Sequence, residues 1–72
     1  MASALEADAM IQIGETAGAI WHSLAENGPQ TIARLVKEID APRDVVMLAL
    51  GWLAREHKID IDAGRSRTVS LR

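Results

Sequence analysis

The sequence predicts a mainly α-helical domain that ends in a β-hairpin. Apolar residues recur at steps of three and four along most of the chain, which is typical of amphipathic helices. The step changes to two after Lys58, which is typical of strands. Glycine and proline break helices, and they interrupt the pattern at Gly28-Pro29 and at Pro42. The helical part is therefore divided into three segments.

The first helix is predicted to run from Met10 to Asn27. Its apolar stripe contains Ile13, Ala17, Ile20 and Leu24. A second stripe beside it contains Gly14, Gly18, Trp21 and Ala25. Gly28-Pro29 predicts a left-handed cap followed by a helix breaker. Ser3 and Glu6 have the spacing of a capping box, so residues 1–9 form either a disordered N-terminal arm or an extension of this helix. The domain proper is expected over residues 10–72.

The second and third helices are predicted from the residues that cap them. Thr31 is expected to cap a short second helix. The apolar residues of that helix are Ile32, Leu35, Val36 and Ile39. A break follows at Asp40, and Pro42 suits the first position of a third helix. This third helix is expected to end near Glu56.

Two strands are predicted on either side of a turn at residues 63–66. Ile59 and Ile61 alternate with two aspartates, and residues 68–71 alternate again. An isolated hairpin is only marginally stable in water, so it must lie on the helices. Three helices followed by a two-stranded wing form the winged helix-turn-helix arrangement, in which the second and third helices make the turn motif.

Two segments of the chain resemble a known family. They are Ile13-Gly14-Glu15-Thr16-Ala17-Gly18 with Trp21, and Ala49-Leu50-Gly51-Trp52-Leu53-Ala54-Arg55-Glu56 with Lys58-Ile59. Over residues 10–71 the chain is similar to a small stand-alone prokaryotic winged helix-turn-helix family of unknown function. The resemblance implies the fold, a tendency to form dimers and, by fold alone, DNA binding. It carries no established site.

The size and composition of the chain predict self-association. A single core in a chain of 72 residues seldom contributes more than about 3–5 kcal/mol to the free energy of unfolding. The chain has no cysteine, so disulfides and thiolate zinc sites are excluded. Of its apolar residues, 12 are alanine, and Trp21 and Trp52 are its only aromatic residues. We therefore expect a homodimer that completes the core.

The two faces of the third helix indicate how that helix is used. The residues expected to anchor the core of the domain are Ile13, Ile20, Trp21, Leu24, Leu35, Val45, Ala49, Trp52 and Leu53. The opposite face of the third helix contains Arg43, Met47, Leu50, Gly51 and Ala54. On this face only Arg43 can donate a hydrogen bond to a base edge. A helix that is apolar all round is normally buried all round, so we assign the other four to a dimer or partner interface. Burial by the wing or the N-terminal arm, and DNA readout, are the alternatives.

Three glycines lie inside predicted helices, where glycine costs about 1 kcal/mol relative to alanine. Gly14 and Gly18 are four residues apart, and Gly51 lies in the third helix. Glu15 and Thr16 interrupt the first pair, which argues against a membrane helix. We expect these glycines to permit close packing between soluble helices.

Basic residues are confined to the second part of the chain. The net charge is −2, which excludes a protein that coats polyanions over its whole surface. Arg65, Arg67 and Arg72 lie in or after the predicted turn and are the expected contacts to DNA phosphates, and Arg43 is the expected contact to a base edge. Such binding would be weak and sensitive to salt. The alternative is a solvated turn whose charges protect the edge of the sheet.

The motifs of the chain favour binding over catalysis. It contains no phosphate-binding glycine loop, nucleophile elbow or zinc-protease motif, so we expect no enzymatic activity, cofactor, metal or small-molecule ligand. No signal peptide or membrane span is visible, which predicts a cytoplasmic protein. The function we expect is a dimeric module in transcription regulation with weak or assisted DNA contact. The alternative is a protein-interaction adaptor whose third helix is an interface.

Overall fold

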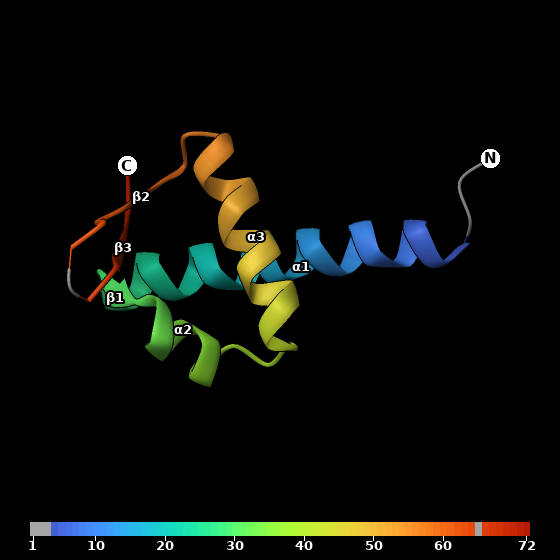
Figure 1. Cartoon of the computed structure of the whole chain (residues 1–72), viewed down its shortest axis with the longest axis horizontal. Helices are drawn as coiled ribbons and strands as arrows, with labels where there is room; N and C mark the ends of the chain where they lie inside the picture. The colour runs from blue at the N-terminus through green and yellow to red at the C-terminus, as the bar shows by residue number, and fades with distance from the viewer. Residues whose placement is uncertain (1–3, 65) are drawn as a thin grey trace.

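The computed structural model describes residues 4–64 and 66–72, with side chains from residue 8 onward. Its elements in chain order are α1 (Ala4–Asn27), β1 (Gln30–Thr31), α2 (Ile32–Glu38), α3 (Arg43–Arg55), β2 (Ile59–Ile61) and β3 (Thr68–Leu71). Three helices followed by a small antiparallel sheet confirm the predicted winged-helix fold (Figure 1).

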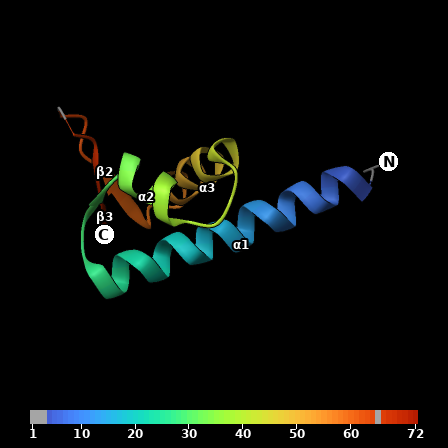
Figure 2. The same cartoon turned by 90° about the horizontal axis from the view of Figure 1, so that it is seen from below.

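Helix α1 begins at Ala4, so the segment expected to be either an arm or a helix extension is helical from that residue. The predicted cap Ser3 lies outside the described residues. At 24 residues, α1 is about 36 Å long. It lies on one side of the molecule, with α2, α3 and the sheet on the other, and its N-terminal turns project beyond them (Figure 2). The helix ends as predicted: Gly28 has φ 79°, and its N–H donates to the Leu24 carbonyl over 2.9 Å.

Helix α2 begins at the predicted cap. The Thr31 hydroxyl accepts a hydrogen bond of 3.1 Å from the Arg34 N–H. This bond satisfies one of the backbone donors that the first turn of a helix leaves without an intrahelical partner. At the other end the Ile39 N–H donates to the Leu35 carbonyl over 2.9 Å. A helix of seven residues depends on such ends, because few of its hydrogen bonds are internal.

Thr31→Ala is expected to lower the free energy of unfolding by about 0.5–2 kcal/mol, because it removes the capping oxygen. Thr31→Ser keeps the oxygen and is expected to stay close to wild type. Urea unfolding followed by circular dichroism measures both. Equal losses in the two variants would assign the effect to the strand position of Thr31 and not to the cap.

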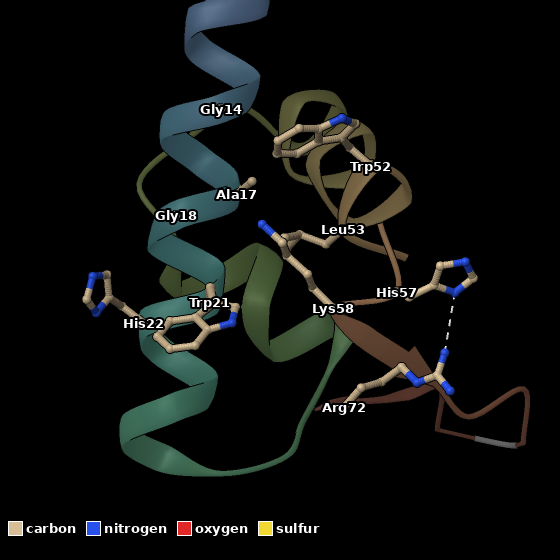
Figure 3. A pocket seen from close by; sticks show the side chains of 10 residues that line it. All are labelled: Gly14, Ala17, Gly18, Trp21, His22, Trp52, Leu53, His57, Lys58 and Arg72. Atoms are coloured by element: carbon tan, nitrogen blue, oxygen red, sulfur yellow. Dashed lines mark hydrogen bonds between the residues drawn. The ribbon is translucent and has the colours of Figure 1, made fainter. Parts of the chain in front are cut away.

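The end of α3 positions two residues of the site described below. The His57 N–H donates to the Ala54 carbonyl over 3.1 Å, and the Lys58 N–H donates to the Leu53 carbonyl over 3.0 Å. Together these bonds form a Schellman cap, in which the residue after the cap adopts a left-handed conformation. His57 holds that position with φ 59°, which reverses the chain, and the Lys58 side chain extends back toward α1 (Figure 3).

The sheet contains one strand more than the predicted hairpin. Its order is β1-β3-β2, and both pairings are antiparallel. In β1, Gln30 pairs with Val69 and Thr31 with Thr68, so the chain between α1 and α2 joins the wing. The Gln30 side chain is buried, and its Nε2 donates to the Ser23 hydroxyl over 2.9 Å. Strand β1 is thereby tied to the last turns of α1.

The core lies between α1, α2, α3 and the inner face of the sheet. It consists of Ala17, Ile20, Leu24, Leu35, Val46, Ala49, Leu50, Leu53, Ile59 and Val69. Among the predicted anchors, five are buried: Ile20, Leu24, Leu35, Ala49 and Leu53. Ile13 and Val45 are half-buried.

Two predicted anchors and one predicted interface residue are placed differently by the structure. Trp21 is 41% exposed and Trp52 is 43% exposed, so neither is a core residue. Leu50, expected on the free face of α3, is 2% exposed. Both stripes of α3 are apolar, so the periodicity could not choose between them. In the structure, α3 contacts α1, α2 and β2. These contacts bury the part of its surface that lies between the two stripes, at Val46, Ala49, Leu50 and Leu53.

Candidate functional site

The exposed face of α3 is apolar along its middle turns. Leu48 is 57% exposed, Met47 is 39% exposed, and Gly51 lies beside them at the surface. Charged side chains occur only at the ends of the helix, at Arg43 and Asp44 and at Arg55. Leu48 was missed by the sequence analysis. Leu48 is exposed because the buried arc of α3 lies between the two predicted stripes, on the opposite side of the helix.

The predicted interface on α3 is accordingly smaller than expected. Leu50 belongs to the core, and Ala54 is half-buried and packed against the core. Met47 and Gly51 remain at the surface. We name the exposed set Met47, Leu48 and Gly51 the outer face of α3. In a recognition helix that binds the major groove of DNA, the corresponding positions would have side chains that donate hydrogen bonds to base edges.

A cleft of about 330 Å³ separates α3 from the wing. Its α3 side is formed by Met47, Leu50 and Gly51, and Ile32 from α2 contributes to its lining. Its wing side is formed by Ile61, Ala63 and Arg67. The cleft thus brings Arg67, a predicted phosphate contact, next to residues of the predicted interface. Arg67 has φ 42°, and its carbonyl accepts from the Ile32 N–H over 3.2 Å.

The four predicted DNA contacts are not shown to form one patch. Arg65 lies outside the described residues. Arg43 begins α3, and Arg67 lies at the wing cleft. The guanidinium of Arg72 is 3.4 Å from an Asp60 carboxylate oxygen and 3.4 Å from His57 Nδ1, and Arg72 is not among the residues that line the wing cleft. Of the four, Arg67 lies beside the outer face of α3 across the wing cleft, and Arg43 lies on α3 itself, one turn before Met47.

A second groove, of about 580 Å³, lies between α1, the end of α3 and the C-terminal residue (Figure 3). We name it the α1 groove. Its lining residues are Gly14, Ala17, Gly18, Trp21, His22, Trp52, Leu53, His57, Lys58 and Arg72. Both tryptophans border it, and the Lys58 side chain extends toward α1 (Figure 3). The sequence analysis missed this groove because its residues come from segments that are distant in the chain.

The helical glycines are not packed against another part of the chain. A Cβ atom added at Gly14, Gly18 or Gly51 would have no atom within 4 Å among the neighbours that such a side chain could meet. The expectation of close packing between helices is therefore wrong within one chain. Each glycine lowers helix stability by about 1 kcal/mol relative to alanine without an intrachain contact in return.

Residues 4–64 and 66–72 contain no group of three or more metal-ligating side chains. None of the helices in that part is long and apolar enough to cross a membrane.

Comparison with known proteins agrees with the fold described above. Residues 7–71 match the model of a family described as a winged helix-turn-helix domain, DUF2582. The chain belongs to this family. It is also similar to an uncharacterized protein of the archaeon Methanocaldococcus jannaschii, with 43% identity over 51 residues that cover 67% of this chain and 71% of the relative. A search of solved structures gave no match. Membership of the DUF2582 family establishes the fold, and a function has to be argued from the residues on the surface of the domain.

Proposed function

We propose that this DUF2582 protein is a non-enzymatic, self-associating regulatory module that contacts DNA weakly through its wing and does not read bases with α3. The observation that carries the proposal is the apolar outer face of α3. Family membership supports the general class, because winged helix-turn-helix domains are commonly nucleic-acid-binding modules.

Base recognition in the major groove needs side-chain donors and acceptors at the centre of the reading helix. Met47, Leu48 and Gly51 offer none. Leu48 and Met47 can touch a thymine methyl group, which does not discriminate one site from another. Arg67, beside this face, suits a phosphate oxygen, which positions a protein on DNA without reading its sequence. The expected DNA affinity is therefore low and falls steeply with salt.

Self-association is supported by the apolar side chains that one chain leaves exposed. Among the described residues, the exposed large apolar side chains are Met10, Ile11, Trp21, Met47, Leu48, Trp52 and Ile61. Scattered exposed apolar residues are normal, but contiguous apolar patches on a small domain mark interaction surfaces. Met10, Trp21 and Trp52 line hollows beside α1, and Met47 and Ile61 line the wing cleft.

Arg67→Ala is expected to weaken retention on duplex DNA at low salt and to reduce the slope of log affinity against log salt by about 1 per copy of the chain. The measurement is fluorescence anisotropy with a labelled duplex at several salt concentrations. Arg55→Ala removes the same charge from the end of α3 and is the matched control. If both variants lose affinity equally, or if wild-type affinity does not fall with salt, the wing is not the contact.

A second candidate function is a protein-interaction adaptor, and the exposure of Leu48 favours it. In that case the outer face of α3 binds another protein and no DNA is bound. Wild-type protein that fails to bind duplex DNA or heparin at low salt would favour the adaptor. Salt-dependent binding that survives in Leu48→Asp would favour contact through the wing.

A further inference from the structure

Every tryptophan and histidine of the chain lines the α1 groove. The sequence has two of each and no phenylalanine or tyrosine. Trp21, His22, Trp52 and His57 come from α1, from α3 and from the turn after α3, yet all four line this one groove. Aromatic side chains that gather at the wall of a cavity, and not in the core, are typical of a site for a small ligand.

The two tryptophans of the groove are half-exposed. Trp21 is 41% exposed and Trp52 is 43% exposed. Aromatic side chains bring more apolar area to a core than any others, and a chain of 72 residues is short of such area. His22 makes a T-shaped contact with Trp21, with ring centroids 5.8 Å apart. The rings therefore offer flat apolar surface to a ligand.

The titratable residues that line the groove are all basic. Lys58 and Arg72 line it together with the two histidines, and no lining residue is acidic, although the chain contains 10 acidic residues. The Arg72 guanidinium is 3.4 Å from an Asp60 carboxylate oxygen. The Lys58 ammonium has no ion-pair partner among the described residues. An unpaired ammonium beside apolar surface favours a ligand with negative charge.

The Lys58 side chain and the open wall of α1 lie opposite each other. In Figure 3 this side chain extends toward α1, in the space between Trp52 and Trp21. Gly14 and Gly18 form the wall of the groove on α1, and a Cβ atom added at either would meet no atom within 4 Å. The groove of about 580 Å³ thus has the size of a small-molecule site, with flat apolar walls and a cation.

We propose that the α1 groove binds a small planar aromatic anion, with its ring against the tryptophans and its carboxylate or phosphate at Lys58. Both groups accept charge-assisted hydrogen bonds from an ammonium, so the shared chemistry is an aromatic ring that bears an oxyanion. The inference goes beyond the proposed function, because it needs neither DNA contact nor self-association. No sequence motif predicts the site, because its residues come from separate segments of the chain.

Titration followed by two-dimensional ¹H–¹⁵N NMR tests the proposal, because both indole N–H signals of the chain come from the groove. Indole-3-acetate and adenosine 5′-monophosphate are the aromatic carboxylate and phosphate probes. Indole-3-acetamide and adenosine are their neutral analogues, and acetate and inorganic phosphate are anions without a ring. We expect at least one aromatic anion to shift both indole signals saturably, and to bind at least about tenfold more tightly than its neutral analogue. The tighter of the two aromatic anions distinguishes carboxylate from phosphate.

Lys58→Ala removes the unpaired cation and is expected to raise the dissociation constant of the aromatic anion at least about fivefold. Lys37→Ala is the matched control, because Lys37 is the only other lysine, is exposed on α2 and does not line the groove. It is expected to bind the anion like wild type. Equal losses in the two variants would mean that the anion responds to overall charge, which overturns the proposal.

Gly18→Leu fills the groove and is expected to abolish the shifts. The variant should stay folded by circular dichroism, because its own chain leaves open space beyond Gly18. Ala19→Leu is the control, since Ala19 is exposed on the same helix and does not line the groove. Binding that survives in folded Gly18→Leu protein would place the anion elsewhere and overturn the proposal.

The remaining outcomes separate this inference from the proposed function. Indole signals that move with neither aromatic anion at millimolar concentration overturn it, and so does equal binding of the charged and neutral probes. Indole signals that move only when the protein is diluted also overturn it, and they assign the groove to a second copy. None of these results bears on the DNA contact, which is tested at Arg67, because Arg67 does not line the α1 groove.

Discussion

Leu50→Asp is expected to abolish the cooperative unfolding transition of the chain, whereas Met47→Asp is expected to keep it. Leu50 is 2% exposed and belongs to the same apolar cluster as Ile20 and Leu53. A carboxylate at this position would be buried without a partner. The resulting loss, about 3–5 kcal/mol or more, is comparable to the whole stability expected of a chain this short.

Met47 makes the comparison informative, because it lies one turn away on the same helix and is 39% exposed. An aspartate there stays in contact with water, so the fold should persist. Thermal unfolding by circular dichroism measures both variants, with Leu50→Met as a control that conserves volume and is expected to cost less than about 1.5 kcal/mol. A wild-type-like transition in Leu50→Asp would mean that α3 exposes the stripe that the sequence had suggested.

Gln30→Glu is expected to lower the free energy of unfolding at pH 7 by about 3–5 kcal/mol. Gln30 is 6% exposed, and its Nε2 donates to the hydroxyl and the carbonyl of Ser23 over 2.9 and 3.3 Å. Its Oε1 is buried without a partner among the described residues. A carboxylate would lose both donated bonds and would be desolvated between α1 and β1.

The loss in Gln30→Glu should depend on pH. Burial raises the pKa of the introduced carboxyl in the folded state above its unfolded value of about 4.3. The neutral form is therefore tolerated at low pH, and stability is lost as the pH rises from the unfolded pKa toward the folded one. Chemical unfolding of variant and wild type at pH 4 and pH 7 should show a smaller difference at pH 4. Gln30→Met loses the same two donated bonds but introduces no charge, so we expect a loss of about 1–3 kcal/mol that is the same at both pH values. An equal loss at both pH values in Gln30→Glu would contradict burial at residue 30.

The helices and their ends were predictable because the signals are local. Gly28 is left-handed where a glycine precedes a proline, and the Thr31 hydroxyl caps α2, as both residues indicated. Strand β1 was missed, since a pair of residues has no alternation to detect, and its pairing with β3 depends on residues at the far end of the chain. The start of α1 at Ala4 was one of two alternatives that the sequence left open.

The candidate surfaces were only partly predictable. Arg67 and the face containing Met47 and Gly51 were identified from the sequence, and the structure places them on one cleft. The α1 groove was not found, because it needs the end of α3 to reverse at His57 and meet α1. The residue pattern of a single segment cannot predict a contact between two segments that are distant in the chain.

The sequence by itself determined the order of the three helices and the hairpin, the caps at Gly28 and Thr31, and the deficit of bulky apolar side chains that predicts a partner. Only the tertiary structure decided which side of α3 is buried and which small residues stay uncovered. The physical reason is that periodicity describes one helix at a time, and both sides of α3 are apolar. Burial is settled by what packs on the helix, and here α1 and the wing enclose Leu50 while Leu48, Trp52 and the glycines of α1 face outward.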